Sequence, residues 1–159
     1  MVTWAEFESA APEFAARAKS LLEAHRHKVL ATLRADGSPR LSGIEGNVGR
    51  GEYWFGAMWQ SRKALDLRRE ARFAIQSGTD DPPAWRGDAR ISGRAIEVVD
   101  QAEVRAIQAE IGGEAPEGPF HLFRAELTEV VVTSLNAAGD RLVIEAWRPG
   151  ASVTRVERE

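Results

Sequence analysis

The chain has 159 residues, of which 43% are hydrophobic and 28% are charged, a composition close to that of an average globular protein. This length and composition exclude a disordered chain and predict one compact domain over residues 1–159. The net charge of −3 argues against a protein that coats nucleic acid, and the absence of cysteine excludes disulfides, Cys-ligated zinc and a thiol nucleophile.

No part of the sequence has the pattern of a membrane segment or a secretory signal. No stretch approaches the roughly 18 consecutive apolar residues that a helix needs to span a bilayer. The N-terminus also lacks the basic start and the continuous apolar run of a signal peptide. We therefore expect a cytoplasmic protein that has no contact with a membrane.

The chain up to His25 has the pattern of an amphipathic helical region. Thr3 and Glu6 have the spacing of a capping box, and apolar residues then recur at intervals of three and four. Pro12 lacks the backbone N–H and crowds the preceding turn, so it fits badly inside a continuous helix. We predict a short helix followed by a second helix that begins at Pro12.

From Lys28 onward the chain has the pattern of a β-meander. Residues 28–34 and 39–48 have the composition of strands, and the Asp36-Gly37 pair between them is typical of a hairpin turn. A second turn at residues 49–52 precedes an aromatic-rich strand at residues 53–58.

The remaining segments predict two inserted helices and further strands. The helices are expected at residues 61–70 and from Asp100 to about Ile111, and the strands at residues 71–77, 88–99, 120–135, 141–147 and 153–156. Six or seven strands joined mostly by short links exclude a parallel βαβ layout. The sequence therefore predicts an α+β fold, an antiparallel β-barrel with helices at its ends.

Two cations, Arg62 and Lys63, lie in the first turn of the helix that begins at Ser61. A helix N-terminus already carries partial positive charge and free N–H groups, so cations there are unfavourable by a few tenths of a kcal/mol to about 1 kcal/mol each. One interpretation is a phosphate site made by these two side chains, the Ser61 hydroxyl and the helix amides. The alternative is a solvated surface on which both cations pair with Asp66.

The strand before this helix has features of a ligand site. Met58 and Trp59 lie where a strand end, a loop and a helix start converge, a corner that suits a flat aromatic ligand carrying a phosphate. Gly43, Gly46 and Gly56 fall inside predicted strands, where glycine indicates either a close approach of the backbone to another group or a bend at a barrel corner.

Other reactive residue types give weak signals. The histidines His25, His27 and His121 are isolated and are expected to be structural. No His, Asp or Glu cluster has metal-ligand spacing, and Ser61 has no recognisable base partner, so neither a metalloenzyme nor a triad hydrolase is supported. Of the tryptophans, we expect only Trp59 and Trp147 near a site.

The segments Val29–Pro39, Tyr53–Ala64 and Leu67–Ile75 together resemble the pyridoxamine 5′-phosphate oxidase-like family of flavin-binding split β-barrels, whose relatives include deazaflavin-dependent reductases. The resemblance is strong over about residues 25–100, and the Ser61-Arg62-Lys63 turn is its most specific part. It implies a homodimeric split barrel with a cofactor at the subunit interface.

The resemblance also implies roles for individual residues. Ser61, Arg62 and Lys63 would hold the cofactor phosphate, while Gly56, Ala57 and Met58 would contact the ring and the ribityl chain. Hydride transfer would then be performed by the flavin, which explains why no triad is present.

The chain departs from the oxidase pattern at three places. The stretch around Ser42 lacks two cations that contact the phosphate in the oxidase. A flavin-contacting glutamine falls near Asp88, and Arg90 is expected to substitute for part of that contact. Trp147 is an approximate equivalent of a C-terminal tryptophan. These departures argue against oxidation of vitamin B6.

The first hypothesis is a flavin-type oxidoreductase that binds FMN, or alternatively the deazaflavin F420, and exchanges a hydride with an unidentified small organic molecule. The second is a non-catalytic flavin or haem binding or storage protein of the same fold. A nucleic-acid-binding barrel is disfavoured by the net charge. The acidic tail of F420 would need a basic groove, for which Arg17, Arg26 and Arg40 are candidates.

Overall fold

The computed structural model describes residues 1–159 and contains four helices and eight strands. The helices are α1 (Trp4–Ala10), α2 (Pro12–Glu23), α3 (Arg62–Arg69) and α4 (Gln101–Ile111). The strands are β1 (His27–Leu33), β2 (Pro39–Gly49), β3 (Glu52–Met58), β4 (Arg72–Gln76), β5 (Asp88–Val98), β6 (Phe120–Leu135), β7 (Leu142–Trp147) and β8 (Thr154–Arg158). Every predicted element is present, with ends shifted by a few residues.

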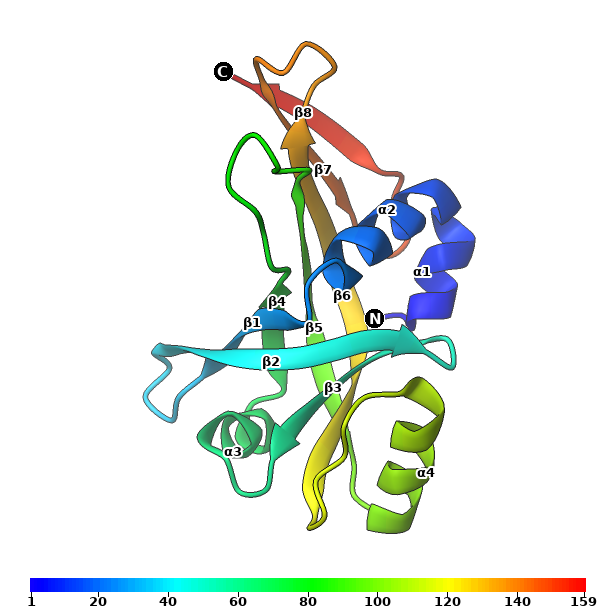
Figure 1. Ribbon diagram of the computed structural model, residues 1–159, viewed down its shortest axis with the longest axis vertical. Helices are drawn as coiled ribbons and strands as arrows, with labels where there is room; N and C mark the ends of the chain where they lie inside the picture. Colours follow the sequence, from blue (N-terminus) through cyan, green and yellow to red (C-terminus); the bar gives the residue numbers. More distant parts are fainter.

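The strands form one antiparallel sheet in the order β3-β2-β1-β4-β5-β6-β7-β8, and a further pairing of β3 with β6 closes the first six into a barrel. The β7–β8 hairpin continues the sheet beyond the barrel and extends toward the top of Figure 1. The predicted α+β antiparallel barrel is thus confirmed. The structure has eight strands rather than six or seven, and the last of them is a full strand whose five residues are all exposed.

The two N-terminal helices pack on one side of the barrel (Figure 1). The capping box is present, because the Thr3 hydroxyl accepts a hydrogen bond from the Glu6 amide and the Glu6 carboxylate accepts one from the Thr3 amide. Pro12 is the first residue of α2, as its missing N–H predicts. The buried faces of both helices join the main core, in which the rings of Phe7 and Trp147 are 4.5 Å apart.

Helix α4 covers the outer face of the barrel at β3 and β6. Side chains on a strand alternate between its two faces, so Phe55 points into the barrel and Trp54 points outward. Trp54 lies beneath Val104 and Ile107 of α4 and beside Leu122 of β6, in a second and smaller core. This second core fixes α4 against the outside of the barrel.

Helix α3 is attached to the barrel through a buried carboxylate in its middle. Asp66 is 4% exposed and accepts hydrogen bonds from the Thr32 hydroxyl at 2.9 Å, from Arg40 Nε at 2.7 Å and from Arg69. Burial alone raises the pKa of the Asp66 carboxyl, but the hydrogen bonds from Arg40 and Thr32 outweigh it and hold the pKa below its ordinary value of 3.8. The charged form of Asp66 therefore stabilises the fold.

We expect Asp66→Ala to lower the free energy of unfolding by about 2–3 kcal/mol, because Arg40 and the Thr32 hydroxyl lose a buried partner. The contribution of Asp66 is present above pH 3.8 and is lost as the pH falls through the lowered folded-state pKa. Urea denaturation over a pH series measures both effects. Asp81→Ala, at an exposed carboxylate, is the control, and equal losses in the two variants would contradict the assignment.

Candidate functional site

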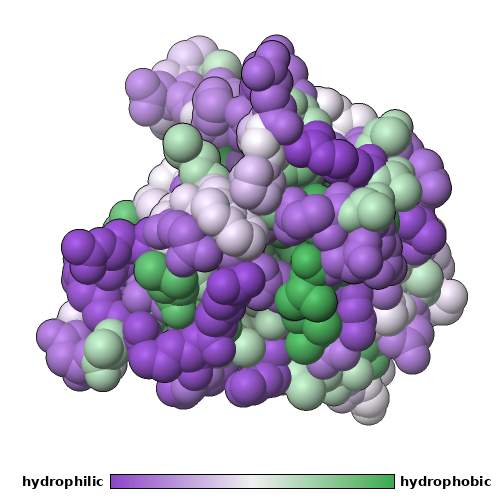
Figure 2. All heavy atoms as spheres, turned by 90° about the horizontal axis from the view of Figure 1, so that it is seen from below, coloured by the Kyte–Doolittle hydropathy of each residue, from purple (hydrophilic) through white to green (hydrophobic).

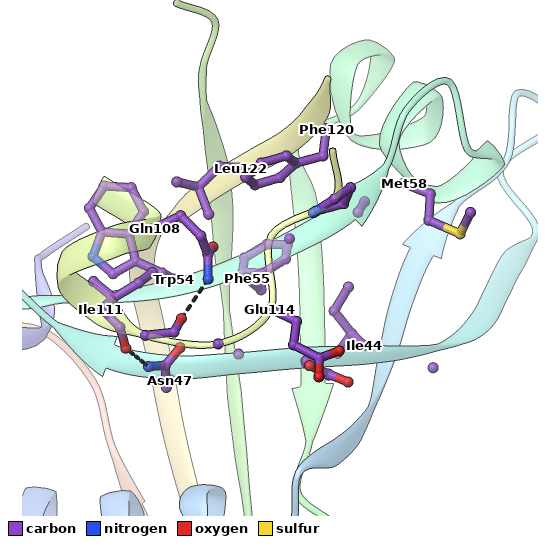
Figure 3. A pocket seen from close by; sticks show the side chains of 18 of the residues that line it. Ile44, Asn47, Trp54, Phe55, Met58, Gln108, Ile111, Glu114, Phe120 and Leu122 are labelled. Atoms are coloured by element: carbon purple, nitrogen blue, oxygen red, sulfur yellow. Dashed lines mark hydrogen bonds between the residues drawn. The ribbon is translucent and has the colours of Figure 1, made fainter. Parts of the chain in front are cut away.

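A cavity of about 480 Å³ lies on the outer face of β2 and β3, between the start of α3 and the end of α4. Figure 3 shows Trp54, Ile111 and Leu122 gathered at one end of it and Met58 toward the other. Twenty residues line the cavity, and eight of them are hydrophobic. Its size is within the range of small-molecule sites, about 300–1,000 Å³.

Glycines form part of the cavity floor. A Cβ atom added to Gly43 would meet no atom within 4 Å, and one added to Gly56 would meet only the His121 carbonyl oxygen at 3.6 Å. Both positions therefore leave bare backbone facing open space, where a flat group can approach closely. Gly46 differs, because its Cβ would be 2.7 Å from the Trp54 carbonyl oxygen of the adjacent strand. Close strand packing explains glycine at that position.

The wall opposite α3 is built by α4 and the loop that follows it, residues 112–116. The Asn47 side-chain amide on β2 donates a hydrogen bond to the Ile111 carbonyl at 2.7 Å, and Gln108 donates to the Gly112 carbonyl (Figure 3). These bonds hold the end of α4 beside β2. The sequence predicted the end of this helix near Ile111 but did not assign the loop that follows it to the site.

Of the two predicted cations, Lys63 lies at the α3 end of the cavity, whereas Arg62 is exposed and does not line it. Lys63 lines the cavity and donates a hydrogen bond from Nζ to the Gly43 carbonyl, and burial lowers the pKa of its ammonium group. Neither Lys63 nor Arg62 forms an ion pair with Asp66, whose partners are Thr32 and two other arginines. The predicted pairs of Arg62 and Lys63 with Asp66 are therefore wrong, although Arg62 itself is solvent-exposed.

The start of α3 is not neutralised by its own residues. Ser61 has the backbone conformation of an N-cap, but its side chain accepts no hydrogen bond from the helix, and the first turn contains no acidic residue. The Ser61 hydroxyl oxygen is buried and has no hydrogen-bond partner. The free amides and the free hydroxyl thus lie beside two cations, which is the arrangement that binds an anion.

The structure brings some of the predicted site residues together and separates others. Gly56, Ala57, Met58 and Lys63 line the cavity, and Ser61 and Arg62 belong to the turn at its end. Trp59 lies in the same turn and stacks on His121, with ring centroids 4.6 Å apart. In the view from below, where α3 and α4 lie, hydrophobic groups reach the surface between hydrophilic ones (Figure 2).

Six of the predicted residues do not line the cavity: Trp59, Ser61 and Arg62 lie in the turn beside it, and the other three lie on other elements. Ser42 lies on β2 with a buried hydroxyl that has no partner. Arg90 is exposed on β5, with Nη2 3.9 Å from a Glu129 carboxylate oxygen. Trp147 is only 2% exposed and packs against Phe7 in the main core, because β7 lies beside the N-terminal helices.

A second hollow of about 510 Å³, lined by no hydrophobic residue, adjoins the cavity at its α4 end. Arg26 lines it and pairs with Glu45 at 2.9 Å and with Glu114 at 3.6 Å. Lys28, which is 5% exposed, donates to the Gly46 carbonyl at 2.9 Å, and burial lowers the pKa of its ammonium group. Acidic side chains therefore surround the cations at this end.

No three His, Asp or Glu side chains are close enough together to hold a metal ion. None of the four helices is both long and apolar enough to cross a membrane.

Residues 14–134, most of the chain, match the family model described as pyridoxamine 5′-phosphate oxidase. The chain belongs to the pyridoxamine 5′-phosphate oxidase family. The family resemblance inferred from the sequence is thus confirmed. No curated protein sequence matches this member of the oxidase family.

Solved structures show the same fold. A conserved hypothetical protein, Rv2991 from Mycobacterium tuberculosis, is 20% identical, with 72% of this chain and 81% of that chain covered and a TM-score of 0.61. An FMN-binding protein from Nostoc punctiforme related to pyridoxamine 5′-phosphate oxidase is 14% identical over 96% of each chain, with a TM-score of 0.59. A structure named F420 reductase is 20% identical, with 70% of this chain and 94% of that chain covered and a TM-score of 0.54.

We expect Asn47→Ala to loosen the cavity wall of this oxidase-family chain without unfolding it. Loss of the bond to the Ile111 carbonyl removes about 1 kcal/mol of local stability, so amide hydrogen exchange at residues 108–116 is expected to quicken about fivefold. Exchange mass spectrometry measures this. Asn136→Ala, in the β6–β7 turn, is the matched control, and unchanged exchange at residues 108–116 would contradict the role given to Asn47.

Proposed function

We propose that the chain is an oxidoreductase that binds FMN in the cavity over β2 and β3 and exchanges a hydride with a small organic molecule. The observation that carries the proposal is the start of α3, a helix end without a neutralising acid, where the Ser61 hydroxyl has no partner and Lys63 lines the cavity. Membership of the family supports it, as do the FMN-binding protein and the F420 reductase of the same fold.

The residues present fit a flavin that carries a phosphate. The phosphate would lie at Ser61 and Lys63, where the orphaned hydroxyl and the free amides of α3 supply donors. The flat ring would lie on the bare backbone of Gly43 and Gly56. The apolar side chains of the second core, with Trp54 at their centre, would exclude water from one side of the ring.

The flavin, when bound, supplies the hydride-transfer chemistry. The chain's own residues bind and orient it: Lys63 and Arg62 balance the negative phosphate, and the Ser61 hydroxyl donates to it. No general acid or base of the chain is assigned to the reaction. Binding of the phosphate would also free the Lys63 ammonium from the Gly43 carbonyl, to which it donates in the ligand-free chain.

We further propose that two copies of the chain cover the cavity together. On the outer face, β1 and β2 expose Val29 and Leu41, with relative exposures of 44% and 71%. Val29 is paired with Gly43 of the cavity floor, so this apolar area is continuous with the cavity. A second copy on this face would bury the apolar area and close the cavity, which places the cofactor at the subunit interface.

The charges favour FMN over F420. The acidic tail of F420 would need free cations beyond the phosphate, and the three candidate arginines are already paired. Arg17 contacts Glu145 at 2.8 Å, Arg26 contacts Glu45 and Glu114, and Arg40 contacts Asp66. Each pair would have to be broken before its arginine binds the tail, which is costly for the buried Arg40–Asp66 pair and costs at most about 1 kcal/mol for the more exposed pairs of Arg17 and Arg26.

The double variant Arg62→Ala/Lys63→Ala is expected to weaken FMN binding about a hundredfold or more, because each charge-assisted contact to a phosphate contributes roughly 1.5–3 kcal/mol. Quenching of flavin fluorescence measures the Kd. Lys19→Ala, on α2, is the matched control, and sedimentation checks that both variants keep the wild-type assembly. Unchanged affinity in a folded double variant would reject the phosphate site.

Gly56→Val is expected to reduce FMN affinity at least tenfold while changing the Tm by only a few degrees. The added Cβ has room in the folded chain, but the side chain stands on the cavity floor. Gly118→Val is the control, because that glycine is in a loop with nothing within 4 Å of an added Cβ.

The spectrum of the purified wild type separates the remaining hypotheses. Flavin absorbance together with steady reduction of the bound flavin by a nicotinamide supports the oxidoreductase. A bound flavin that is never turned over would indicate storage, and a Soret band would indicate haem.

A further inference from the structure

One buried histidine connects the turn before α3 to the end of the barrel. His121 of β6 is 0% exposed, and its imidazole stacks with the Trp59 indole, with planes inclined by 11°. Arg68 of α3 lies over the Trp59 ring, with its guanidinium carbon 5.9 Å from the centroid. These contacts join β6, the turn and α3 in one cluster.

The hydrogen bonds of His121 define which nitrogen carries the proton. The Gln60 backbone N–H donates to Nε2 at 3.1 Å, so Nε2 is the unprotonated nitrogen. The proton is then on Nδ1, which lies 2.6 Å from a Glu97 carboxylate oxygen. This network requires a neutral imidazole with its Nδ1–H directed at Glu97.

Glu97 is well suited to hold this tautomer. Arg68 donates two hydrogen bonds to its carboxylate, at 2.7 Å and 2.9 Å. Burial alone raises the pKa of the Glu97 carboxyl, but the hydrogen bonds from Arg68 and His121 outweigh it and hold the pKa below its ordinary value. Glu97 therefore remains a hydrogen-bond acceptor. Glu97, which contacts the imidazole, and Arg68, which contacts Glu97, are the two charged side chains of this cluster.

The turn that His121 binds has a backbone conformation that Gln60 does not favour by itself. Its φ angle is +56°, in the left-handed region that glycine adopts more readily. The next residue, Ser61, donates its amide to the Met58 carbonyl at 3.1 Å and begins α3. The bond from the Gln60 N–H to His121 is thus the external contact that sets the direction in which α3 starts.

We propose that neutral His121 is a positioning residue for the anion site: by accepting the Gln60 N–H, it fixes the turn at residues 58–61 so that the first turn of α3 faces the phosphate. This inference rests on the proposed function, because the anion is the FMN phosphate. A proton on Nε2 would oppose the Gln60 N–H with a second donor and break the bond.

Three variants test the proposal by their FMN affinity at about pH 8, where imidazoles are neutral. His121→Phe keeps an aromatic ring beneath Trp59 and removes the acceptor. His121→Gln keeps a side-chain acceptor that does not titrate. His25→Gln, at a partly exposed histidine paired with Asp80, is the matched control.

His121→Phe is expected to raise the Kd for FMN about tenfold, the effect of one lost hydrogen bond. His121→Gln, which restores an acceptor, and His25→Gln are expected to bind FMN within about threefold of wild type. Wild-type affinity in folded His121→Phe, or equal losses in His121→Phe and His121→Gln, would overturn the proposal.

Ligand-free NMR provides a readout that does not need the cofactor. The ¹⁵N shifts of His121 are expected to show the Nδ1–H tautomer, and the Gln60 amide is expected to exchange at least tenfold faster in His121→Phe than in wild type. If wild type binds no flavin, the proposed function fails, and the amide exchange still decides whether His121 holds the turn. Equal Gln60 exchange in the two proteins would overturn that role.

Discussion

The docking of α3 by a carboxylate in its middle is the interaction on which the proposed site depends. Asp66 is committed to Thr32 and Arg40 inside the structure, so it is not available to the cations one turn earlier. The first turn of α3 also has no acid and no side-chain cap. The helix is therefore held firmly at its centre while the positive end of its dipole stays uncompensated. Because the helix is rigid, its N-terminal end needs little reorganisation when a ligand binds.

The barrel separates stability from function. Its interior is filled with apolar side chains, and the cavity lies outside, on the outer faces of β2 and β3. The second core under α4 supplies the apolar wall of that cavity. Bare backbone at Gly43 and Gly56 opens the floor without weakening the interior, because both glycines face outward. One sheet thus serves two environments through the alternation of its side chains.

Local patterns predicted most of the elements. The Thr3–Glu6 box, the Asp36-Gly37 turn and the position of Pro12 each depend on neighbours in sequence, and each occurs as expected. The closure of the barrel by β3 and β6 does not depend on neighbours in sequence. It pairs Trp54 with Arg124, which are far apart in the sequence, and no local pattern specifies that pairing.

The candidate site could be predicted only in part, because tertiary structure brings together residues that no local pattern connects. The Ser61–Lys63 turn was recognisable because its cations contradict the helix dipole. The loop after α4 and the role of His121 were not, because a lone histidine or a glycine pair has no spacing that identifies its spatial partners. Trp147 was expected near the site but packs in the core, since the position of β7 beside α1 follows from tertiary structure alone.

The β7–β8 hairpin lies outside the closed six-strand barrel, so the outer edge of β8 is a free edge of the sheet. Its unpaired backbone groups could bind a strand of another chain, which makes such an edge a template for aggregation. This edge carries three charges among its five residues, all of which are solvent-exposed: Arg155, Glu157 and Arg158. Burying those charges against another strand is costly, so self-association through this edge is opposed.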